Sequence, residues 1–200
     1  MAKRIGILAL QGDFARHAAM LRMLGVEAVE IRGCEQLDDC DGLILPGGES
    51  TTLAKLMDKY RFYEPLRQFA RRRPLMGTCA GAILAAAEVD DPRVKPLALI
   101  DISVQRNAYG RQVDSFITEV AAPCLGQPPF FRAIFIRAPR IIGCGPETEI
   151  LISFQNQPVM VRQGNILVLT FHPELTADPR IHHFFLGMTE KREQPSLAGR

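Results

Sequence analysis

Residues 74–88 read PLMGTCAGAILAAAE, and this stretch decides the fold. A short apolar run at 74–77 predicts a buried strand, and the small residues at 80–88 predict a helix that follows at once. Between them, GTCAG at 77–81 has the form G-x-nucleophile-x-G, which is typical of a sharp turn from strand to helix. The sequence therefore predicts an α/β protein with Cys79 exposed at the end of a strand.

The chain before this stretch alternates between strand and helix patterns. Short apolar runs bounded by turn residues predict strands at 4–10, 27–32 and 41–45, and helical spacing of apolar residues predicts helices at 14–25, 52–60 and 66–73. Such alternation is typical of a mostly parallel sheet covered by helices on both faces. We expect a three-layer α/β fold.

The pattern changes after about residue 97, where Pro, Gly and Asn separate short segments of strand character. These predicted strands are 115–121, 132–137, 149–155, 158–162 and 166–170. We expect antiparallel additions to the main sheet, with a hairpin turn at 163–165 and a last helix at 180–190. Residues 1–190 then form a single domain, and the polar tail at 191–200 is expected to fray.

Composition excludes several classes of protein. The 200 residues are 47% hydrophobic and 23% charged, which excludes intrinsic disorder. Because 24 Lys and Arg face 22 Asp and Glu, nucleic acid is not an expected partner. The dense basic run at 71–73 is interpreted as a solvated helix end.

Targeting and redox signals are also missing from the sequence. No segment reaches the ~20 apolar residues of a membrane span, and the apolar run at 5–10 is too short for a secretory signal. Five cysteines without a CxxC pair predict neither a disulfide framework nor a zinc site. We expect a cytoplasmic protein in which four cysteines are small buried hydrophobes and Cys79 is the exception.

Cys79 is the candidate nucleophile. A helix N-terminus beneath it favours the thiolate, and the N–H group of Ala80 is placed to meet a developing oxyanion. The alternative is a structural cysteine buried among small residues.

His172 and Glu174 supply what such a nucleophile needs. They follow the predicted strand 166–170, and residues i and i+2 of an extended chain point the same way. The carboxylate can then orient the imidazole, so a Cys-His-Glu triad is the natural interpretation. Taken alone, His-Pro-Glu could equally be a capped turn that leads into the last helix.

The loop PGGES at 46–50 is a candidate binding element. Gly47 and Gly48 allow the backbone to approach a ligand closely, and Ser50 is the expected N-cap of the next helix. A plain strand-to-helix turn is the alternative. No dinucleotide or P-loop glycine motif occurs, so those cofactors have no support.

Two arginines and three histidines remain to be interpreted. Arg106 and Arg137 each end or interrupt an apolar strand, and either could clamp a carboxylate, although a surface arginine is the alternative. His17, His182 and His183 are interpreted as helix-surface or partner-facing residues. Adjacent helical residues such as His182 and His183 do not face one ligand, so no metal pair is expected.

Taken together, several segments resemble one known family. They are ILALQGD (7–13), PGGEST (46–51), GTCAG (77–81), SVQRNAYGRQVDSF (103–116), FIRAPRI (135–141) and FHPELTADPRIHHFFL (171–186). They are similar to the glutaminase subunits of the two-component pyridoxal 5'-phosphate synthase, which are class I, or triad, glutamine amidotransferases. The resemblance implies a flavodoxin-like fold. Ala82 departs from the usual larger aliphatic residue, and 121–131 matches too poorly for any assignment.

The resemblance also implies roles for individual residues. Cys79, His172 and Glu174 would hydrolyse L-glutamine to glutamate and ammonia through a Cys thioester, without a metal or cofactor. Gly47 and Ala80 would form the oxyanion hole. The residues that match glutamine-binding positions are Gly47, Gly48, Glu49, Arg106, Ile136 and Arg137.

The implied partner is the synthase subunit, which receives the ammonia. Family members sit on a ring-shaped core, with up to twelve glutaminases on twelve synthases, and are weakly active until they dock. Gln11 and the first helix are expected near that contact. Other possibilities are a different triad glutaminase, such as that of histidine biosynthesis, a silent regulator of the synthase, or a cysteine-elbow stress protein.

Overall fold

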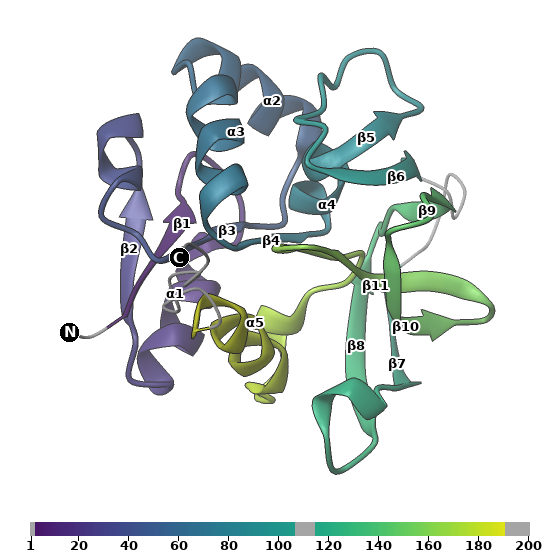
Figure 1. Ribbon diagram of the computed structural model, residues 1–200. Coiled ribbons are helices and arrows are strands. Elements are labelled where there is room, and N and C mark those ends of the chain that lie inside the picture. The colour runs from purple at the N-terminus through teal and green to yellow at the C-terminus, as the bar shows by residue number, and fades with distance from the viewer. Residues whose placement is uncertain (1–2, 107–114, 191–200) are drawn as a thin grey trace, which may run out of the picture.

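The computed structural model describes residues 3–106 and 115–190, so the tail 191–200 and most of the segment QRNAYGRQ lie outside it. A seven-stranded sheet of order β10-β11-β12-β4-β3-β1-β2 forms its centre (Figure 1). Its strands are β1 (Arg4–Leu8), β2 (Glu27–Ile31), β3 (Gly42–Leu45), β4 (Leu75–Thr78), β10 (Glu149–Phe154), β11 (Gln157–Gln163) and β12 (Ile166–Leu169). The five strands from β2 to β12 run parallel in the flavodoxin-like order.

Helices cover both faces of this sheet. In Figure 1, α2 (Ser50–Lys59) and α3 (Tyr63–Arg72) lie above it, and α1 (Phe14–Met23) and α5 (Arg180–Glu190) lie below. Successive strand residues point to opposite faces, so Leu43 and Leu45 pack with the upper layer and Ile44 with the lower. All three are fully buried. The predicted three-layer arrangement is therefore confirmed.

The C-terminal strands are distributed differently from the prediction. Only β10 and β11 join the main sheet antiparallel, and the hairpin turn after Gln163 is present, because Gln163 pairs with Ile166. β7 (Ser115–Ala121) and β8 (Phe130–Ile136) form a separate two-stranded sheet. Phe131 and Phe135 of β8 pack their rings on Phe171, at centroid distances of 5.8 and 5.6 Å. This aromatic packing holds the pair against the core rather than at the edge of the sheet.

The helix expected at 80–88 is shorter than predicted. α4 (Ala80–Ala85) ends where β5 (Ala86–Val89) begins, and β5 pairs with β6 (Ile100–Gln105), which pairs with β9 (Arg140–Cys144). The carbonyl of Leu84 accepts a hydrogen bond from the N–H of Leu97 at 2.7 Å. Alanine favours a helix, but these tertiary hydrogen bonds override a preference of only a few tenths of a kcal/mol per residue. Sequence reasoning missed β5 and β9, and it anticipated β6 only as an apolar strand that Arg106 ends.

Two smaller expectations also fail. Glu49, not Ser50, is the N-cap of α2, and its carboxylate accepts the N–H groups of Thr51 and Thr52 at 3.1 and 2.7 Å. All five cysteines are free, but Cys144 is exposed because it ends β9, an edge strand of its sheet. Cys34 and Cys124 are half-buried, so of the four cysteines expected to be buried only Cys40 is. Cys79, which was expected to be exposed, is buried as well, because α4 follows it at once and the loops after the neighbouring strands cover it.

In the ranges 3–106 and 115–190, no helix combines the length and the apolar character needed to cross a bilayer. The structured connections include three short 3-10 turns, η1 (Cys34–Leu37), η2 (Pro123–Leu125) and η3 (Pro173–Leu175). Of these, η3 directly follows His172 and so bears on the candidate site.

Gly81 allows α4 to press against β3, and we expect its replacement to destabilise the protein. A Cβ at this position would lie 2.0 Å from the carbonyl oxygen of Leu45. Gly81→Ala should lower the free energy of unfolding by about 1–3 kcal/mol or more. Gly187→Ala in α5 is the matched control, because nothing lies within 4 Å of its Cβ position. It should stabilise by roughly 0.5–1 kcal/mol. Urea unfolding measures both, and equal effects would contradict the packing argument.

Candidate active site

The candidate site lies where four neighbouring parallel strands end. The carboxyl ends of β1, β3, β4 and β12 meet at one edge of the sheet, which is where ligands bind in open α/β folds. The loops that follow these strands help to enclose a cleft of about 390 Å³. Its lining residues are Gln11, Asp13, Gly48, Glu49, Ser50, Cys79, Ile83, Arg106, Ile136, Arg137 and His172.

Cys79 occupies a strained turn between β4 and α4. Its φ of 46° and ψ of −100° are unusual for a residue with a side chain, and such strain costs on the order of 1–3 kcal/mol. The backbone holds the turn, since the N–H of Cys79 donates to the carbonyl of Leu169 at 2.9 Å. Ala80 is the first residue of α4, so its N–H is among those without an acceptor inside the helix. The thiol therefore borders the cleft beside a free donor of the kind an oxyanion needs.

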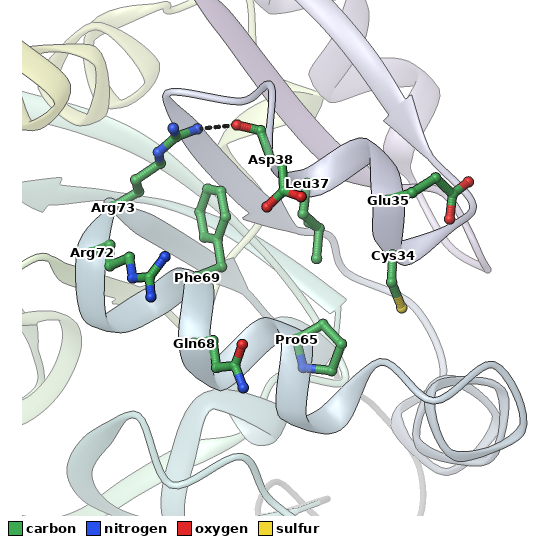
Figure 2. Close-up of a pocket in the computed structure, with 9 residues that line it drawn as sticks. All are labelled: Cys34, Glu35, Leu37, Asp38, Pro65, Gln68, Phe69, Arg72 and Arg73. Atoms are coloured by element: carbon green, nitrogen blue, oxygen red, sulfur yellow. Dashed lines mark hydrogen bonds between the residues drawn. The ribbon is translucent and has the colours of Figure 1, made fainter.

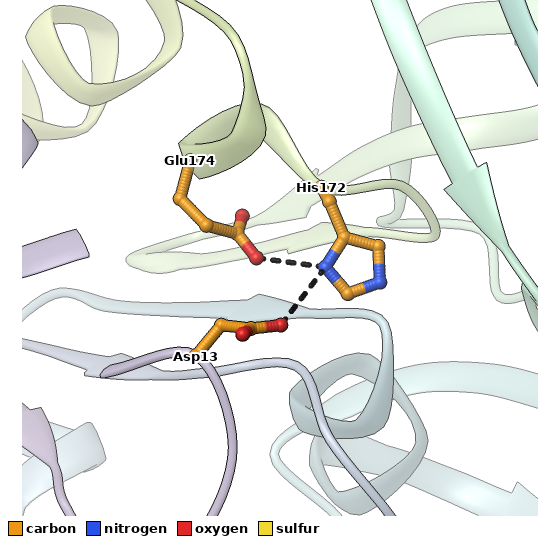
Figure 3. Close-up of side chains that lie close together, drawn as sticks. All are labelled: Asp13, His172 and Glu174. Carbon is orange, nitrogen blue, oxygen red and sulfur yellow. Dashed lines mark hydrogen bonds and ion pairs between the residues drawn. The ribbon is translucent and has the colours of Figure 1, made fainter. Parts of the chain in front are cut away.

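His172 and Glu174 are in direct contact. Nδ1 of His172 lies 2.7 Å from Oε1 of Glu174, as Figure 3 shows, and both side chains are buried. The predicted contact is present, but an extended chain does not produce it. Pro173 begins the 3-10 turn η3, and this turn folds the carboxylate back to the imidazole. The N–H of His172 donates to the carbonyl of Ile134 at 2.9 Å and fixes the start of the turn.

The electrostatics of this pair favour a charged imidazole. Burial alone would lower the pKa of His172, but the neighbouring Cys79 and the Glu174 carboxylate, which Nδ1 contacts, raise it to about 10. Burial raises the pKa of Glu174, but His17 and His172 lower it by more, so the pKa of Glu174 lies below its usual value. At neutral pH, His172 is therefore an imidazolium that lies between Cys79 and the Glu174 carboxylate.

The loop after β3 packs directly on this group. A Cβ on Gly47 would lie 2.4 Å from Cε1 of His172, so only glycine fits there. Gly48 has a φ of 153°, and the N–H of Glu49 donates to Oε1 of Gln11 at 3.0 Å. Gln11, expected at a partner contact, therefore lines the cleft and holds this loop.

Arg106 lies at the far wall of the cleft between two carboxylates. Its Nη2 is 3.3 Å from Oε1 of Glu49, and its Nη1 contacts Asp91. Burial raises the pKa of Glu49, but hydrogen bonds from Thr51 and Thr52 outweigh it and lower the pKa to about 2. An ionised carboxylate and a guanidinium therefore stand side by side on this wall.

Ile136 and Arg137 complete the predicted set. Arg137 also has a positive φ, of 43°, and both residues line the cleft. The carbonyl of Ile136 lies 3.9 Å from Sγ of Cys79 and accepts its hydrogen bond. The structure thus gathers all the predicted site residues at one edge of the sheet.

Asp13 is a cleft residue that sequence reasoning missed. Oδ2 of Asp13 lies 4.0 Å from Nδ1 of His172, and Figure 3 shows it below Glu174, with both carboxylates pointing to the same ring nitrogen. Asp13, His172 and Glu174 offer ligand atoms within 4.8 Å of one another. Because Nδ1 already bonds Glu174, the triad itself explains this grouping without a metal. The signal in the sequence was the position of Asp13, three residues after the strand predicted at 4–10.

The prediction that His17 and His182 lie on helix surfaces is wrong. Both are fully buried, and Nδ1 of His17 lies 2.9 Å from Nε2 of His182. Their neighbours Ala18 and Ile181 belong to the apolar faces of α1 and α5, and this spacing could have revealed their burial. His183 is exposed, as expected.

A second hollow, of about 320 Å³, lies between η1 and α3 (Figure 2). Its lining residues are Cys34, Glu35, Leu37, Asp38, Pro65, Gln68, Phe69, Arg72 and Arg73. The thiol of Cys34 donates to backbone carbonyls, and burial together with Glu35 raises its pKa. A thiol of this kind is a poor nucleophile. None of the predicted site residues lies here, and Arg71 and Arg72 are exposed as expected.

A cysteine on a strained elbow, with a His-Glu pair beside it and a cleft that offers both charges, defines a cysteine-dependent enzyme that acts on amides. The fold places it among the triad amidotransferases. The family model of the SNO glutamine amidotransferase family matches residues 7–191, and the chain therefore belongs to this family.

Individual relatives agree with the family match. The pyridoxal 5'-phosphate synthase subunit PdxT of Desulforudis audaxviator (strain MP104C) is 49% identical over 188 residues, which are 94% of this chain and 99% of the relative. The protein of the same name from Moorella thermoacetica (strain ATCC 39073 / JCM 9320) is 51% identical and covers 92% of this chain and 98% of its own. A crystal structure of a glutamine amidotransferase superposes with a TM-score of 0.88 at 43% identity, covering 93% of this chain and 98% of that one. These matches confirm the predicted fold class.

Burial of His182 makes stability depend on pH. Burial and His17 lower the pKa of His182 from 6.5 to about 3. Between these two pH values, His182 is protonated in the unfolded chain but neutral in the folded protein. Stability present above pH 6.5 is lost as the pH falls toward 3. Between pH 6.5 and 4.5, wild type should lose about 2 kcal/mol more than His182→Leu.

Urea unfolding across this pH range measures the difference. His183→Leu, an exposed position on the same helix, is the matched control and should decline as wild type does. A His182→Leu variant that declines as steeply as wild type would show that burial of His182 is not the cause.

Proposed function

We propose that this chain is the glutaminase subunit of a pyridoxal 5'-phosphate synthase, and that its substrate is L-glutamine. The observation that carries the proposal is the geometry of Cys79, His172 and Glu174, a nucleophile on a strained elbow with an oriented imidazole. The name PdxT, carried by relatives about half identical over nearly the whole chain, supports the synthase role. Residues 1–190 act as one glutaminase domain in this proposal, in keeping with the family match over 7–191.

Acylation uses the proton that the imidazole already holds. That proton comes from the Cys79 thiol, so the sulfur attacks the side-chain carbonyl carbon of glutamine as a thiolate, and the N–H groups of Gly47 and Ala80 stabilise the oxyanion. His172, held by Glu174, then donates its proton to the leaving nitrogen as the C–N bond breaks. Ammonia leaves, and a γ-glutamyl thioester remains on Cys79.

Deacylation reverses the roles of the same groups. Neutral His172 takes a proton from water, and the water oxygen attacks the thioester carbon. The C–S bond breaks, glutamate leaves, and His172 and Cys79 return to their starting protonation. Burial of Glu174 beside His172 keeps the imidazole in one orientation through both steps.

The charges of the cleft match those of an amino acid. Free glutamine carries an α-carboxylate and an α-ammonium group, which need a cation and an anion close together. Arg106 and Glu49 provide them 3.3 Å apart, and Arg106 is only 11% exposed. Gly48, Ile136 and Arg137 line the rest of the cleft, so we assign them to the same substrate.

The ammonia requires a partner that uses it. We propose that the chain docks on a ring-shaped synthase core in the cytoplasm, with up to twelve subunits of each kind, as the family resemblance implies. Docking is then expected to raise its activity.

Glutamate release from glutamine, with and without a synthase subunit, tests the assignment. Wild type should turn over faster with the partner, and Cys79→Ala should lose activity by about a thousandfold or more, because no other group in the cleft forms the thioester. Cys144→Ala, at an exposed cysteine that does not line the cleft, is the matched control and should behave as wild type. Wild-type protein that docks but stays silent would leave only a regulatory role.

Arg106→Gln tests the substrate contact. Loss of the guanidinium removes the partner of the substrate carboxylate, so KM for glutamine should rise about tenfold or more while kcat changes less. Arg93→Gln is the matched control, because Arg93 also binds Asp91 but does not line the cleft. Steady-state kinetics on both variants measure the change in KM separately from the change in kcat. Equal effects would show that Asp91, not substrate, explains the role of Arg106.

A further inference from the structure

A row of buried polar side chains lies behind Glu174, on the side away from His172. Oε1 of Glu174 binds His172, and Oε2 lies 3.3 Å from Nε2 of His17. The other ring nitrogen of His17, Nδ1, lies 2.9 Å from Nε2 of His182. The mechanism above uses neither histidine.

This row joins four elements of the fold. His17 comes from α1, His182 from α5 and Glu174 from η3, and all three side chains are 0% exposed or nearly so. Nε2 of His17 also lies 3.3 Å from Oγ1 of Thr78, the residue that precedes Cys79. His17 therefore contacts both the carboxylate of the triad and the strand that carries the nucleophile.

The proton positions in this row follow from the chemistry of its end groups. An ionised carboxylate can only accept hydrogen bonds, and buried Oε2 of Glu174 accepts none with good geometry among the described residues, so the polar group that stabilises it is Nε2 of His17 at 3.3 Å. His17 must then carry its proton on Nε2, where the N–H donates to the Thr78 hydroxyl and places its positive end next to Oε2 of Glu174. Nδ1 of His17 is left as an acceptor for the Nε2–H of His182.

The opposite arrangement fails at both ends. With the proton on Nδ1, His17 would turn a nitrogen lone pair toward the Glu174 carboxylate. His182 would then need its proton on Nδ1, which has no hydrogen-bond partner in the described part of the chain. A buried N–H without an acceptor is more costly than a buried lone pair. The two ends of the row therefore select the same tautomers.

We propose that His17, supported by His182, is a positioning residue that holds the Glu174 carboxylate ionised and aimed at His172. The inference rests on the proposed triad. The charged and titratable groups that face His17 are Glu174 and His172 from the η3 segment, Asp13 beside α1 and His182 from α5. Burial lowers the pKa of both histidines, which keeps the pair neutral while Glu174 and His172 carry charge.

Kinetics of His17→Leu with a synthase subunit present test this role. Without the His17 N–H, Oε2 of Glu174 loses the polar group that stabilises its charge, so we expect kcat to fall about 10- to 100-fold with KM unchanged. The acid limb of the pH profile of kcat should also move to higher pH, because Glu174 then holds a proton more readily. A merely structural loss would lower kcat without moving this limb.

Two further variants separate the explanations. His17→Gln keeps an N–H near the same place and should restore part of kcat and of the pH profile. His183→Leu, exposed on the helix that carries His182, is the matched control and should retain wild-type kinetics. A folded His17→Leu variant with wild-type kcat and pH profile would overturn the proposal.

A measurement on unmodified protein covers the case in which variants fail to fold. Nitrogen-15 NMR of the histidine rings at pH 7 should show His17 neutral with its proton on Nε2, and a proton on Nδ1 would overturn the proposal. The kinetics also distinguish a failure of the proposed triad from a failure of the role proposed for His17. Inactive wild type would remove the triad itself, whereas active wild type with an unaffected His17→Leu variant would remove only the role of His17.

Discussion

The turn between β4 and α4 is the constraint on which the rest of the site depends. Cys79 adopts a positive φ there, and Gly81 brings α4 so close to β3 that its Cβ position lies 2.0 Å from a backbone oxygen. Only glycine fits at position 81, because any Cβ there would collide with the carbonyl oxygen of Leu45. The strain is retained because packing from both sides determines the backbone. It fixes where the thiol points and hence where His172 must be.

The parallel sheet brings the partners of that thiol to it. Cys79 and His172 are far apart in sequence, but β4 and β12 are neighbours, and their carboxyl ends lie at one edge. β3 is the neighbour on the other side, which puts Gly47 against the imidazole. One strand order thus assembles nucleophile, base and glycine loop, while β10 and β11 extend the sheet beyond β12.

The residues of the site also differ in their exposure to solvent. The substrate wall, with Glu49 and Arg106, opens to the cleft, whereas Glu174 and the two histidines behind it are closed to water. Charge at the wall can meet a soluble amino acid at modest cost. Buried Glu174 stays ionised because an imidazole ring contacts each of its two carboxylate oxygens. The buried residues Glu174, His17 and His182 therefore control the catalytic activity of the residues that line the cleft.

The sequence by itself determined the strand-helix alternation, the elbow at Cys79 and the pairing of His172 with Glu174, because each depends on neighbours in the chain. Tertiary structure alone decided the rest. Helix-favouring alanines at 86–87 became a strand by pairing with β6, and Asp13 and His17 reached the triad through the packing of α1. Contacts between residues distant in the chain leave no local pattern, so only the folded chain reveals them.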